Sequence, residues 1–354
     1  MQLKSLVPLK SLTMTLSALA LSAACGAAFA ADSLTITSWG GAYQTSQDEA
    51  YYKPYTAKTG TKIVQEEYNG EAARIRAMVE SGNTTWDAVD VDAATAQQGC
   101  DEGFLTPIDY SKFGGEAAFV KGSTFECGIP TIIYSTIYAY DADKIKDGPT
   151  TIAGLFDTKK WPGKRSLQKT PFGNLEFALM ADGVPADKVY ETLKTKEGVD
   201  RAFKKLDTIK SDIVWWEAGA QPPQLLASGE VVMATAWNGR IFNANKVDKK
   251  NFKIVWDGQL LDYDLWAIPK GVKDLDAVYK FIEFASSPEA QAAQTKYISY
   301  GPALLAATPL VSPDILKDLP TAPANAKTAL ANDPVFWGDN KEELLKRFNT
   351  WIAQ

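Results

Sequence analysis

The chain has 354 residues, a formal net charge of −6, three cysteines and no histidine. The acidic balance argues against nucleic acid as a partner, because binding phosphate groups requires a basic face. The absence of histidine excludes Ser-His-Asp and Cys-His catalysis and every histidine-based zinc site. Neither a metal nor a cofactor is predicted.

Residues 1–30 have the pattern of a cleavable secretory signal peptide. Two lysines precede an apolar run over residues 12–24, and small side chains at residues 28–30 suit a signal peptidase. The apolar run is too short to favour a membrane-spanning helix. The mature protein is therefore predicted to begin near Ala31 and to reside in the periplasm. Lipoprotein processing at Cys25 is the alternative, although the usual Leu three positions before the cysteine is missing.

Removal of the signal takes away Lys4 and Lys10 and no acidic residue, so the formal charge of the mature chain becomes −8. It also leaves two cysteines, Cys100 and Cys127. In an exported protein such a pair predicts one disulfide. Closing a loop of this length would stabilise the fold by roughly 3.5 kcal/mol in the chain-entropy model. The alternative, two free buried thiols, does not suit an oxidising compartment.

The first part of the mature chain alternates strands and helices. Short connections join these elements, and that order predicts a parallel sheet with crossover helices. The expected strands cover residues 33–38, 62–66 and 88–92. The expected helices cover residues 44–57, 70–80 and 93–102. Asp92 stands between the third strand and the third helix, where its carboxylate could cap the helix or contact a ligand.

A long β-branched and aromatic run over residues 131–140 is expected to pass into a second α/β domain. Strands are predicted there at residues 165–167, 213–216, 231–236 and 252–256. Helices are predicted at residues 151–156, 175–181, 187–194, 199–210 and 222–227. An extended segment at residues 263–269 could carry the chain back. The remaining predicted elements are helices at 275–286 and 289–297, a turn at 300–302 and a final helix at 341–352.

The end of one predicted strand is unusual for a core strand. Residues 233–240 begin as an apolar strand and stop on Trp237, an amide, a glycine and Arg240. An aromatic side chain and a cation at the mouth of a strand look like the lining of a ligand cleft. The alternative is a strand end with one core tryptophan and one solvated arginine, which would pair with an acid such as Asp257.

Several short motifs, in a fixed order along the chain, resemble those of a known family. They are Trp39-Gly40-Gly41, Trp237-Asn238-Gly239, Asp264 before Ala267-Ile268-Pro269, the helix around Phe281 with Ser287-Pro288-Glu289, and Ile298-Ser299-Tyr300-Gly301-Pro302. With these motifs the chain resembles the periplasmic solute-binding proteins of ABC importers, in the spermidine/putrescine-binding branch. The ordered set is more specific for the family than for the ligand.

The resemblance implies an α/β fold of two lobes, each a mostly parallel sheet flanked by helices, with the ligand in the cleft between them. The first lobe is expected at residues 31–137 and 266–310, and the second at residues 138–265. A helical tail at residues 311–354 is expected to pack across both lobes. The resemblance also implies cleft closure on the ligand, docking of a monomer onto an ABC permease at the inner membrane, and no enzymatic activity.

By similarity, the family's aromatic and acidic ligand positions are present in this chain, but three features depart from polyamine binders. Residues 169–173 contain no acid, Asp262 stands where a tryptophan is expected, and Arg240 replaces a small or polar residue. The predicted ligand-binding residues are Trp39, Gly40, Tyr43, Asp92, Trp237, Arg240, Asp264 and Tyr300.

These departures favour a zwitterionic ligand. A buried diamine needs an acceptor at each end, whereas this cleft offers one carboxylate, Asp264, and one cation, Arg240. The amine is predicted to lie on Asp264 with cation–π help from one of the two tryptophans. The ligand's carboxylate is predicted to lie on Arg240 and on N–H groups of the Gly40-Gly41 turn. The ω-amino acid 4-aminobutyrate has this charge pattern, and the resemblance includes a branch of the family that binds it.

The sequence leaves two other functions open. Putrescine or spermidine would fit if Asp92, Asp262 or Glu217 supplied the missing anion. A secreted glycosidase-like enzyme would need a pair of carboxylates, and Asp262 and Asp264 lie about 7 Å apart along one strand face. No nucleophile motif accompanies that pair, so a binding protein is the preferred interpretation.

Overall fold

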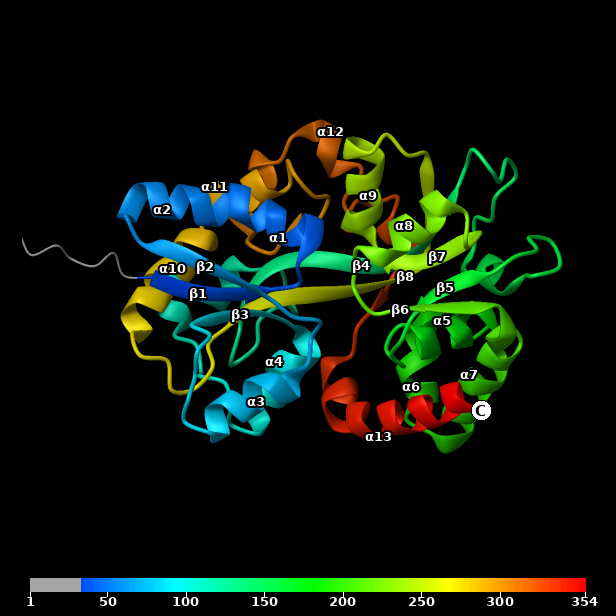
Figure 1. The fold of residues 1–354 in the computed structure, drawn as a ribbon, viewed down its shortest axis with the longest axis horizontal. Helices are drawn as coiled ribbons and strands as arrows, with labels where there is room; N and C mark the ends of the chain where they lie inside the picture. The colour runs from blue at the N-terminus through cyan, green and yellow to red at the C-terminus, as the bar shows by residue number, and fades with distance from the viewer. Residues whose placement is uncertain (1–32) are drawn as a thin grey trace, which may run out of the picture. The chain divides into compact units, whose positions relative to one another are not determined.

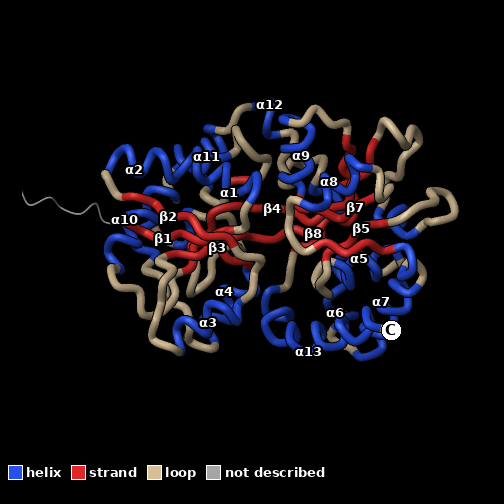
Figure 2. Tube along the Cα trace, in the orientation of Figure 1, coloured by secondary structure: helices blue, strands red, loops and turns tan. Residues whose placement is uncertain are grey.

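The computed structural model describes residues 33–354, so the predicted signal peptide and the alternative processing site at Cys25 lie outside the described residues. The described residues form a mixed sheet with helices on both sides (Figure 1). The strand order is β2-β1-β3-β8-β4-β7-β5-β6, with β10 beside β8 and β9 beside β4. Figure 2 shows the strands as one band with helices above and below it. Within residues 33–354, no helix is long and apolar enough to cross a membrane.

One end of the sheet is built by the first three strands, which are parallel to one another as the β-α-β-α-β-α order predicts. The strands are β1 (Ser33–Ser38), β2 (Lys62–Glu67) and β3 (Ala88–Asp92). The helices are α1 (Gly41–Gln47), the π-helix η1 (Asp48–Tyr52), α2 (Lys53–Thr59), α3 (Ala72–Glu80) and α4 (Ala93–Asp101). The single helix predicted at residues 44–57 is therefore three consecutive helical segments that begin at Gly41.

Two long antiparallel strands form the middle of the sheet. They are β4 (Ile129–Asp141) and β8 (Phe252–Ala267), paired from Ile129 opposite Trp266 to Asp141 opposite Phe252. β4 takes the chain from one end of the sheet to the other, and β8 brings it back (Figure 1). The extended segment expected at 252–256 and residues 263–267 of the one expected at 263–269 are parts of this one strand.

The other end of the sheet is also parallel at its edge, where β5 pairs with both β6 and β7. The strands are β5 (Arg165–Gln168), β6 (Ile213–Trp216) and β7 (Met233–Trp237). The helices around them are η4 (Ile152–Phe156), α5 (Asn174–Ala181), η5 (Ala186–Lys188), α6 (Val189–Leu193), α7 (Lys196–Asp207), η6 (Lys210–Asp212), α8 (Gln221–Ser228) and α9 (Asn238–Val247). Helix α9 was not predicted: it starts directly after β7, at the amide and glycine on which the predicted strand stops.

Short elements and two helical stretches complete the fold. They are η2 (Tyr110–Phe113), η3 (Glu116–Ala118), α10 (Leu275–Ala285), α11 (Pro288–Gln294), β9 (Gly301–Pro302), η7 (Leu305–Leu310), α12 (Pro313–Leu316), η8 (Ala326–Thr328), β10 (Leu330–Ala331) and α13 (Pro334–Ala353). The final helix is longer than the predicted 341–352, because Asp333 caps its N-terminus by accepting from Phe336 N.

Two large groups of buried apolar side chains stabilise the two ends of the sheet. One includes Ile36, Tyr52, Trp266, Phe281 and Ile282. The other includes Leu167, Leu175, Phe203, Leu206 and Phe348. Helix α13 belongs to the second group through its apolar face, and it also reaches α4, since Lys341 Nζ donates to Thr95 Oγ1 at 3.4 Å.

A disulfide joins Cys100 in α4 to Cys127 in the segment before β4, as the cysteine pair predicted. It closes a loop with a sequence separation of 27. The bond therefore ties the start of the central β4 strand to the helix that follows β3.

Replacing both cysteines by alanine is expected to lower the free energy of unfolding by roughly 3.5 kcal/mol, because the closed loop restricts the unfolded chain. Urea unfolding followed by tryptophan fluorescence measures the difference. The matched control is the wild-type protein in a reducing agent, which should unfold at the same lower midpoint. Equal midpoints for oxidised and reduced wild type would contradict this prediction.

Candidate functional site

Six of the eight predicted ligand-binding residues line one small cavity at the middle of the sheet. Its volume is about 10 Å³, enough for about one water molecule. The lining comes from both ends of the sheet and from the long strands between them. The lining residues are Trp39, Tyr43, Tyr134, Trp237, Arg240, Asp264 and Tyr300. Sequence reasoning missed Tyr134, although it lies in the aromatic run that was predicted to cross between domains.

The turn between β1 and α1 brings Trp39 and Tyr43 to this cavity. Gly40 and Gly41 have φ values of 61° and 55°, which glycine adopts without the strain of a side chain. A Cβ on Gly41 would lie 3.0 Å from Arg240 Nη1. Glycine at position 41 therefore lets the guanidinium approach the turn closely.

Arg240, in the first turn of α9, is buried rather than solvated, with a relative exposure of 3%. Its Nη1 donates to Gly40 O at 2.8 Å and its Nη2 to Trp39 O at 3.1 Å. Its Nε is buried and has no hydrogen-bond partner among residues 33–354. The alternative of a solvated arginine paired with Asp257 is wrong, because Arg240 is buried and Asp257 instead accepts from Ile152 N at 2.9 Å.

Gly40 contributes to the site differently from the prediction. Its carbonyl oxygen accepts from Arg240, whereas its N–H donates to Gln44 Oε1 at 3.1 Å. The N–H group that was expected to help bind a carboxylate is therefore already engaged inside the protein. The Nη1 and Nη2 atoms of Arg240 donate to backbone carbonyl oxygens. Its Nε–H group is left to donate to a further acceptor.

The Trp237-Asn238-Gly239 motif has a physical explanation in this arrangement. The Trp237 ring is a wall of the cavity. Asn238 is fully buried; its Oδ1 accepts from Ser135 N at 2.9 Å and its Nδ2 donates to Ser299 O at 2.7 Å. A Cβ on Gly239 would lie 2.5 Å from the Tyr300 ring. The motif thus holds β4, the β7–α9 junction and Tyr300 against one another.

The aromatic rings around the cavity pack edge to face. The centroids of Trp39 and Trp237 are 5.7 Å apart, and those of Tyr43 and Tyr300 are 5.3 Å apart. Tyr134 lies 6.4 Å from Trp237 and 6.1 Å from Tyr300. Such an aromatic box suits an alkyl chain that ends in a cation, since ring faces attract cations and exclude water.

Asp264, on β8, is the carboxylate of the cavity and is 94% buried, with a relative exposure of 6%. Burial raises its pKa well above the ordinary aspartate value, and the neighbouring Asp90, Asp262 and Asp92 raise it further, while Arg240 lowers it. Asp92 lies directly opposite Asp264 in the antiparallel β3–β8 pair. An added positive charge at this carboxylate would therefore be strongly favoured.

Asp90, which was not predicted, lies behind the aromatic walls. It is fully buried and accepts from Trp39 Nε1 at 3.1 Å, Tyr43 OH at 2.7 Å and Gln47 Nε2 at 2.5 Å. Burial raises its pKa to about 7. The signal was present in the strand at residues 88–92, because alternate residues of a strand point to one face and Asp90 therefore shares a face with Asp92.

Asp92 caps α4, because its carboxylate accepts from Thr95 N at 2.6 Å. The capping interpretation is confirmed, and ligand contact stays a prediction. Asp92 lines a second, larger cavity of about 460 Å³, which shares the walls Trp39, Tyr134 and Trp237 with the small one. The lining of this larger space also includes the charged side chains of Glu71, Arg76, Lys169, Glu217, Lys341 and Glu342.

The two other acids considered from the sequence are engaged by protein groups. Asp262 is buried and accepts from Tyr134 OH at 3.2 Å, Asn332 Nδ2 at 3.0 Å and Tyr263 N at 2.9 Å. Glu217 is exposed and pairs with Lys169 at 2.9 Å. Asp262 does not line the small cavity, so Asp264 is the one carboxylate in that lining.

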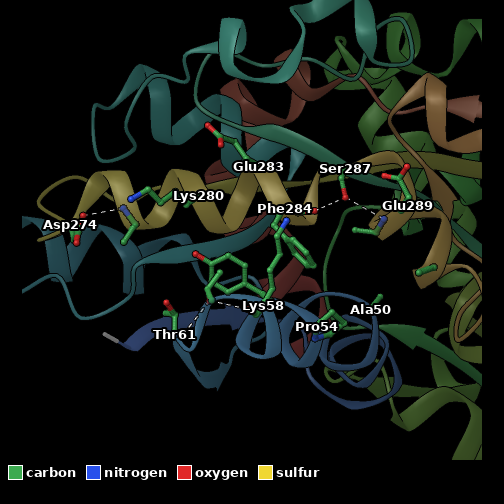
Figure 3. A pocket seen from close by; sticks show the side chains of 15 residues that line it. Ala50, Pro54, Lys58, Thr61, Asp274, Lys280, Glu283, Phe284, Ser287 and Glu289 are labelled. Atoms are coloured by element: carbon green, nitrogen blue, oxygen red, sulfur yellow. Dashed lines mark hydrogen bonds between the residues drawn. The ribbon is translucent and has the colours of Figure 1, made fainter. Parts of the chain in front are cut away.

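A further hollow of about 900 Å³ lies away from these residues, between the helices η1–α2 and α10–α11 (Figure 3). Lys58 and Lys280 stand there with Asp274 and Glu283, so both charge signs are present. None of the predicted site residues lines it. Its mixed charge selects no ligand class.

The fold and the small cavity together define a solute-binding protein with two lobes. Residues 50–324 match the family of bacterial extracellular solute-binding proteins, and the chain belongs to this family. A gamma-aminobutyric acid-binding protein of Pseudomonas aeruginosa is 46% identical over 335 residues, covering 93% of this chain and 95% of that protein. The putrescine-binding periplasmic protein PotF of Escherichia coli is 23% identical over 314 residues, covering 79% of this chain and 82% of that protein.

Solved structures agree with this assignment. The structure titled Atu4243-GABA receptor has a TM-score of 0.81 at 35% identity, covering 91% of this chain and 98% of that one. The binding protein AgtB of A. tumefaciens R10, in complex with agropinic acid, has a TM-score of 0.83 at 35% identity, covering 91% and 99%. The relatives are two-lobed periplasmic binding proteins, so the predicted fold class is confirmed, and the chain is a binding protein rather than an enzyme.

Replacing Asn238 by alanine is expected to lower the free energy of unfolding by about 1–3 kcal/mol, because Ser135 N and Ser299 O would be left buried without partners. Urea unfolding measures this change. Asn243→Ala in the same helix is the matched control, since its side chain makes no hydrogen bond within residues 33–354, and it should unfold like the wild type. Similar losses in both variants would refute the anchoring role of Asn238.

Proposed function

We propose that this protein is the substrate-binding component of an ABC importer and that it captures 4-aminobutyrate. The observation that carries the proposal is the pairing of one buried carboxylate, Asp264, with one buried cation, Arg240, in the lining of a single aromatic cavity. A zwitterion with an aliphatic spacer matches both charges. The names of the 46% identical relative and of a structural neighbour point to the same ligand.

The ligand's amine is proposed to bind Asp264, and its carboxylate to bind the free Nε side of Arg240. A guanidinium offers a planar edge that matches a carboxylate. The rings of Trp39 and Trp237 would enclose the methylene chain. A cavity of about 10 Å³ cannot hold this ligand without movement of the walls, so binding is proposed to couple to opening and closing of the cleft.

The lobes are proposed to follow the boundaries expected from the sequence, with residues 31–137 and 266–310 in one lobe and residues 138–265 in the other. Arg240 would then contact Trp39 and Gly40 across the cleft. Ligand contacts from both lobes would favour the closed state, which the membrane permease could recognise. Export to the periplasm by the signal at residues 1–30 and a monomeric state complete the proposal.

A polyamine is the second candidate, since putrescine- and spermidine-binding proteins are among the relatives at 23–25% identity. Arg240 argues against it, because a buried guanidinium repels an ammonium group. The anions outside the small cavity are also less suitable: Asp92 caps a helix, and Asp262 is engaged by three protein donors. A second ammonium would therefore lack a dedicated partner.

Titration calorimetry of the mature protein against 4-aminobutyrate, putrescine, spermidine, proline and choline tests the choice of ligand. A micromolar site corresponds to about −8 kcal/mol. We expect 4-aminobutyrate to bind at this level or tighter, and putrescine to bind at least about 100-fold more weakly, a difference of about 2.7 kcal/mol. Tight binding of putrescine with no binding of 4-aminobutyrate would favour the polyamine function instead.

The role of Arg240 needs a test that separates ligand contact from support of the Trp39-Gly40 turn. We expect Arg240→Ala to weaken 4-aminobutyrate by about 2–5 kcal/mol, because the ligand's carboxylate loses a buried charged partner. Affinity for n-butylamine, which has the same amine and no carboxylate, should fall much less. Equal losses for both compounds would show that Arg240 acts only on the protein structure.

A further inference from the structure

The buried carboxyl group of Asp90 has no ligand to bind, because it lies behind the cavity. Its relative exposure is 0%, and its three donors come from Trp39, Tyr43 and Gln47. Tyr68 OH also donates to the backbone oxygen of Asp90 at 2.7 Å. Two of these partners are aromatic walls of the cavity, so Asp90 holds the position of the walls.

Asp90 is also a close neighbour of Asp264. Asp92 lies opposite Asp264 in the β3–β8 pair, and Asp90 is two residues away on the same strand, so the two side chains share a face of the sheet. Both side chains are buried, and the Asp90 carboxylate already accepts hydrogen bonds from Trp39, Tyr43 and Gln47. Two ionised carboxylates so close together in a buried site repel each other, and one proton held by the pair relieves that repulsion.

The surroundings supply little positive charge to this pair. Arg240 is the one cation in the lining of the small cavity, and two of its nitrogens donate to backbone carbonyls. The titratable and charged groups around the pair are Tyr43 on α1, Tyr51 and Tyr52 on η1, Tyr68 after β2, Asp92 on β3, Tyr134 on β4, Arg240 on α9, Asp262 on β8 and Tyr300 before β9. Burial raises the pKa of every one of these tyrosines, so their hydroxyl groups stay neutral and add no charge.

We propose that Asp90 and Asp264 share one proton in the ligand-free cleft and that the ammonium group of the ligand displaces this proton to solvent. The inference rests on the proposed function. Before binding, the pair carries one negative charge. After binding, two carboxylates face one ammonium, so the net charge of the cluster is again −1 and one proton has left. Asp90 is thus a positioning residue that sets the protonation state of Asp264.

The direction of the pKa shifts agrees with this arrangement. Burial raises the pKa of Asp90 to about 7. Burial, followed by the charge of Asp90, raises the pKa of Asp264 well above the ordinary value. A proton therefore competes with the ligand for Asp264, and the competition strengthens as the pH falls. Affinity should decrease up to tenfold per pH unit on the acid side of this pKa.

Calorimetry in buffers of different ionisation enthalpy counts the protons released. The probe is 4-aminobutyrate, and the pH range is ~5.5 to ~7.5, chosen around the raised pKa of about 7. The ligand keeps both of its charges across this range, so its own titration does not interfere. We expect the slope of observed enthalpy against buffer ionisation enthalpy to give about one proton released per ligand at the acid end. A slope of zero with normal binding would overturn the proposal.

Asp90→Asn assigns the proton to this pair. An amide cannot share a proton with Asp264 in the same way, so we expect release to fall well below that of the wild type and to move to lower pH. Asp87→Asn is the matched control: Asp87 precedes β3, accepts from Thr35 N at 2.7 Å and lines neither cavity. Unchanged proton release in Asp90→Asn would overturn the proposal and point to Asp262.

The possible failures are distinguishable. If 4-aminobutyrate does not bind the wild type, the proposed function is wrong. If it binds without proton release, the proposed function stands and the shared proton is wrong. If Asp90→Asn does not fold, the wild-type proton count and its pH dependence decide, because a purely structural role for Asp90 would produce neither.

Discussion

The central constraint on this structure is the free-energy cost of burying Asp264 and Arg240 in the lining of one aromatic cavity. Asp264 and Arg240 are both at least 94% buried, and each is an ionisable group that needs a partner to remain charged away from water. The protein satisfies Arg240 in part, through the carbonyl oxygens of Trp39 and Gly40. Asp264 instead has three acidic neighbours, so burial and their charges raise its pKa well above the ordinary aspartate value. A zwitterionic ligand would supply an ammonium group to Asp264 and a carboxylate to Arg240.

The rest of the fold places these groups with little freedom. The long strands β4 and β8 cross the whole sheet and bring Tyr134 and Asp264 to its middle. Glycines at positions 41 and 239 allow close approach of Arg240 and of the Tyr300 ring. Packing and hydrogen bonds therefore restrict the side chains within each wall, so the walls would have to move as units to admit a ligand.

Much of the fold was predictable from the sequence, because strand and helix periodicity reports which face of each element is buried. The β-α alternation gave the parallel strands at both ends, and the apolar run at residues 131–140 identified β4. Helix α9 was missed because Asn238 and Gly239 are ordinary loop residues, yet here their roles are tertiary: Asn238 joins two distant segments, and Gly239 makes room for Tyr300.

The site was predictable residue by residue, but its internal hydrogen bonds were not. Six predicted residues line the cavity, and four of them, Trp39, Trp237, Asp264 and Tyr300, lie in the motifs that resemble the family. Asp90 was missed because a buried acid in a strand looks, in sequence, like a polar strand end. The orientation of Arg240 was also unpredictable, since its partners are backbone atoms about 200 residues away in the chain. Every residue carries a backbone carbonyl, so the sequence does not indicate which carbonyl a distant arginine will bind.

The orientation of the bound ligand is the most direct test of this account. A crystal structure of the mature protein with 4-aminobutyrate should place the ligand's ammonium within hydrogen-bonding distance of Asp264, at about 2.7–3.2 Å, and its carboxylate on Arg240. The methylene chain should lie between Trp39 and Trp237. A ligand bound in the larger cavity beside Asp92, or with its carboxylate away from Arg240, would contradict the account.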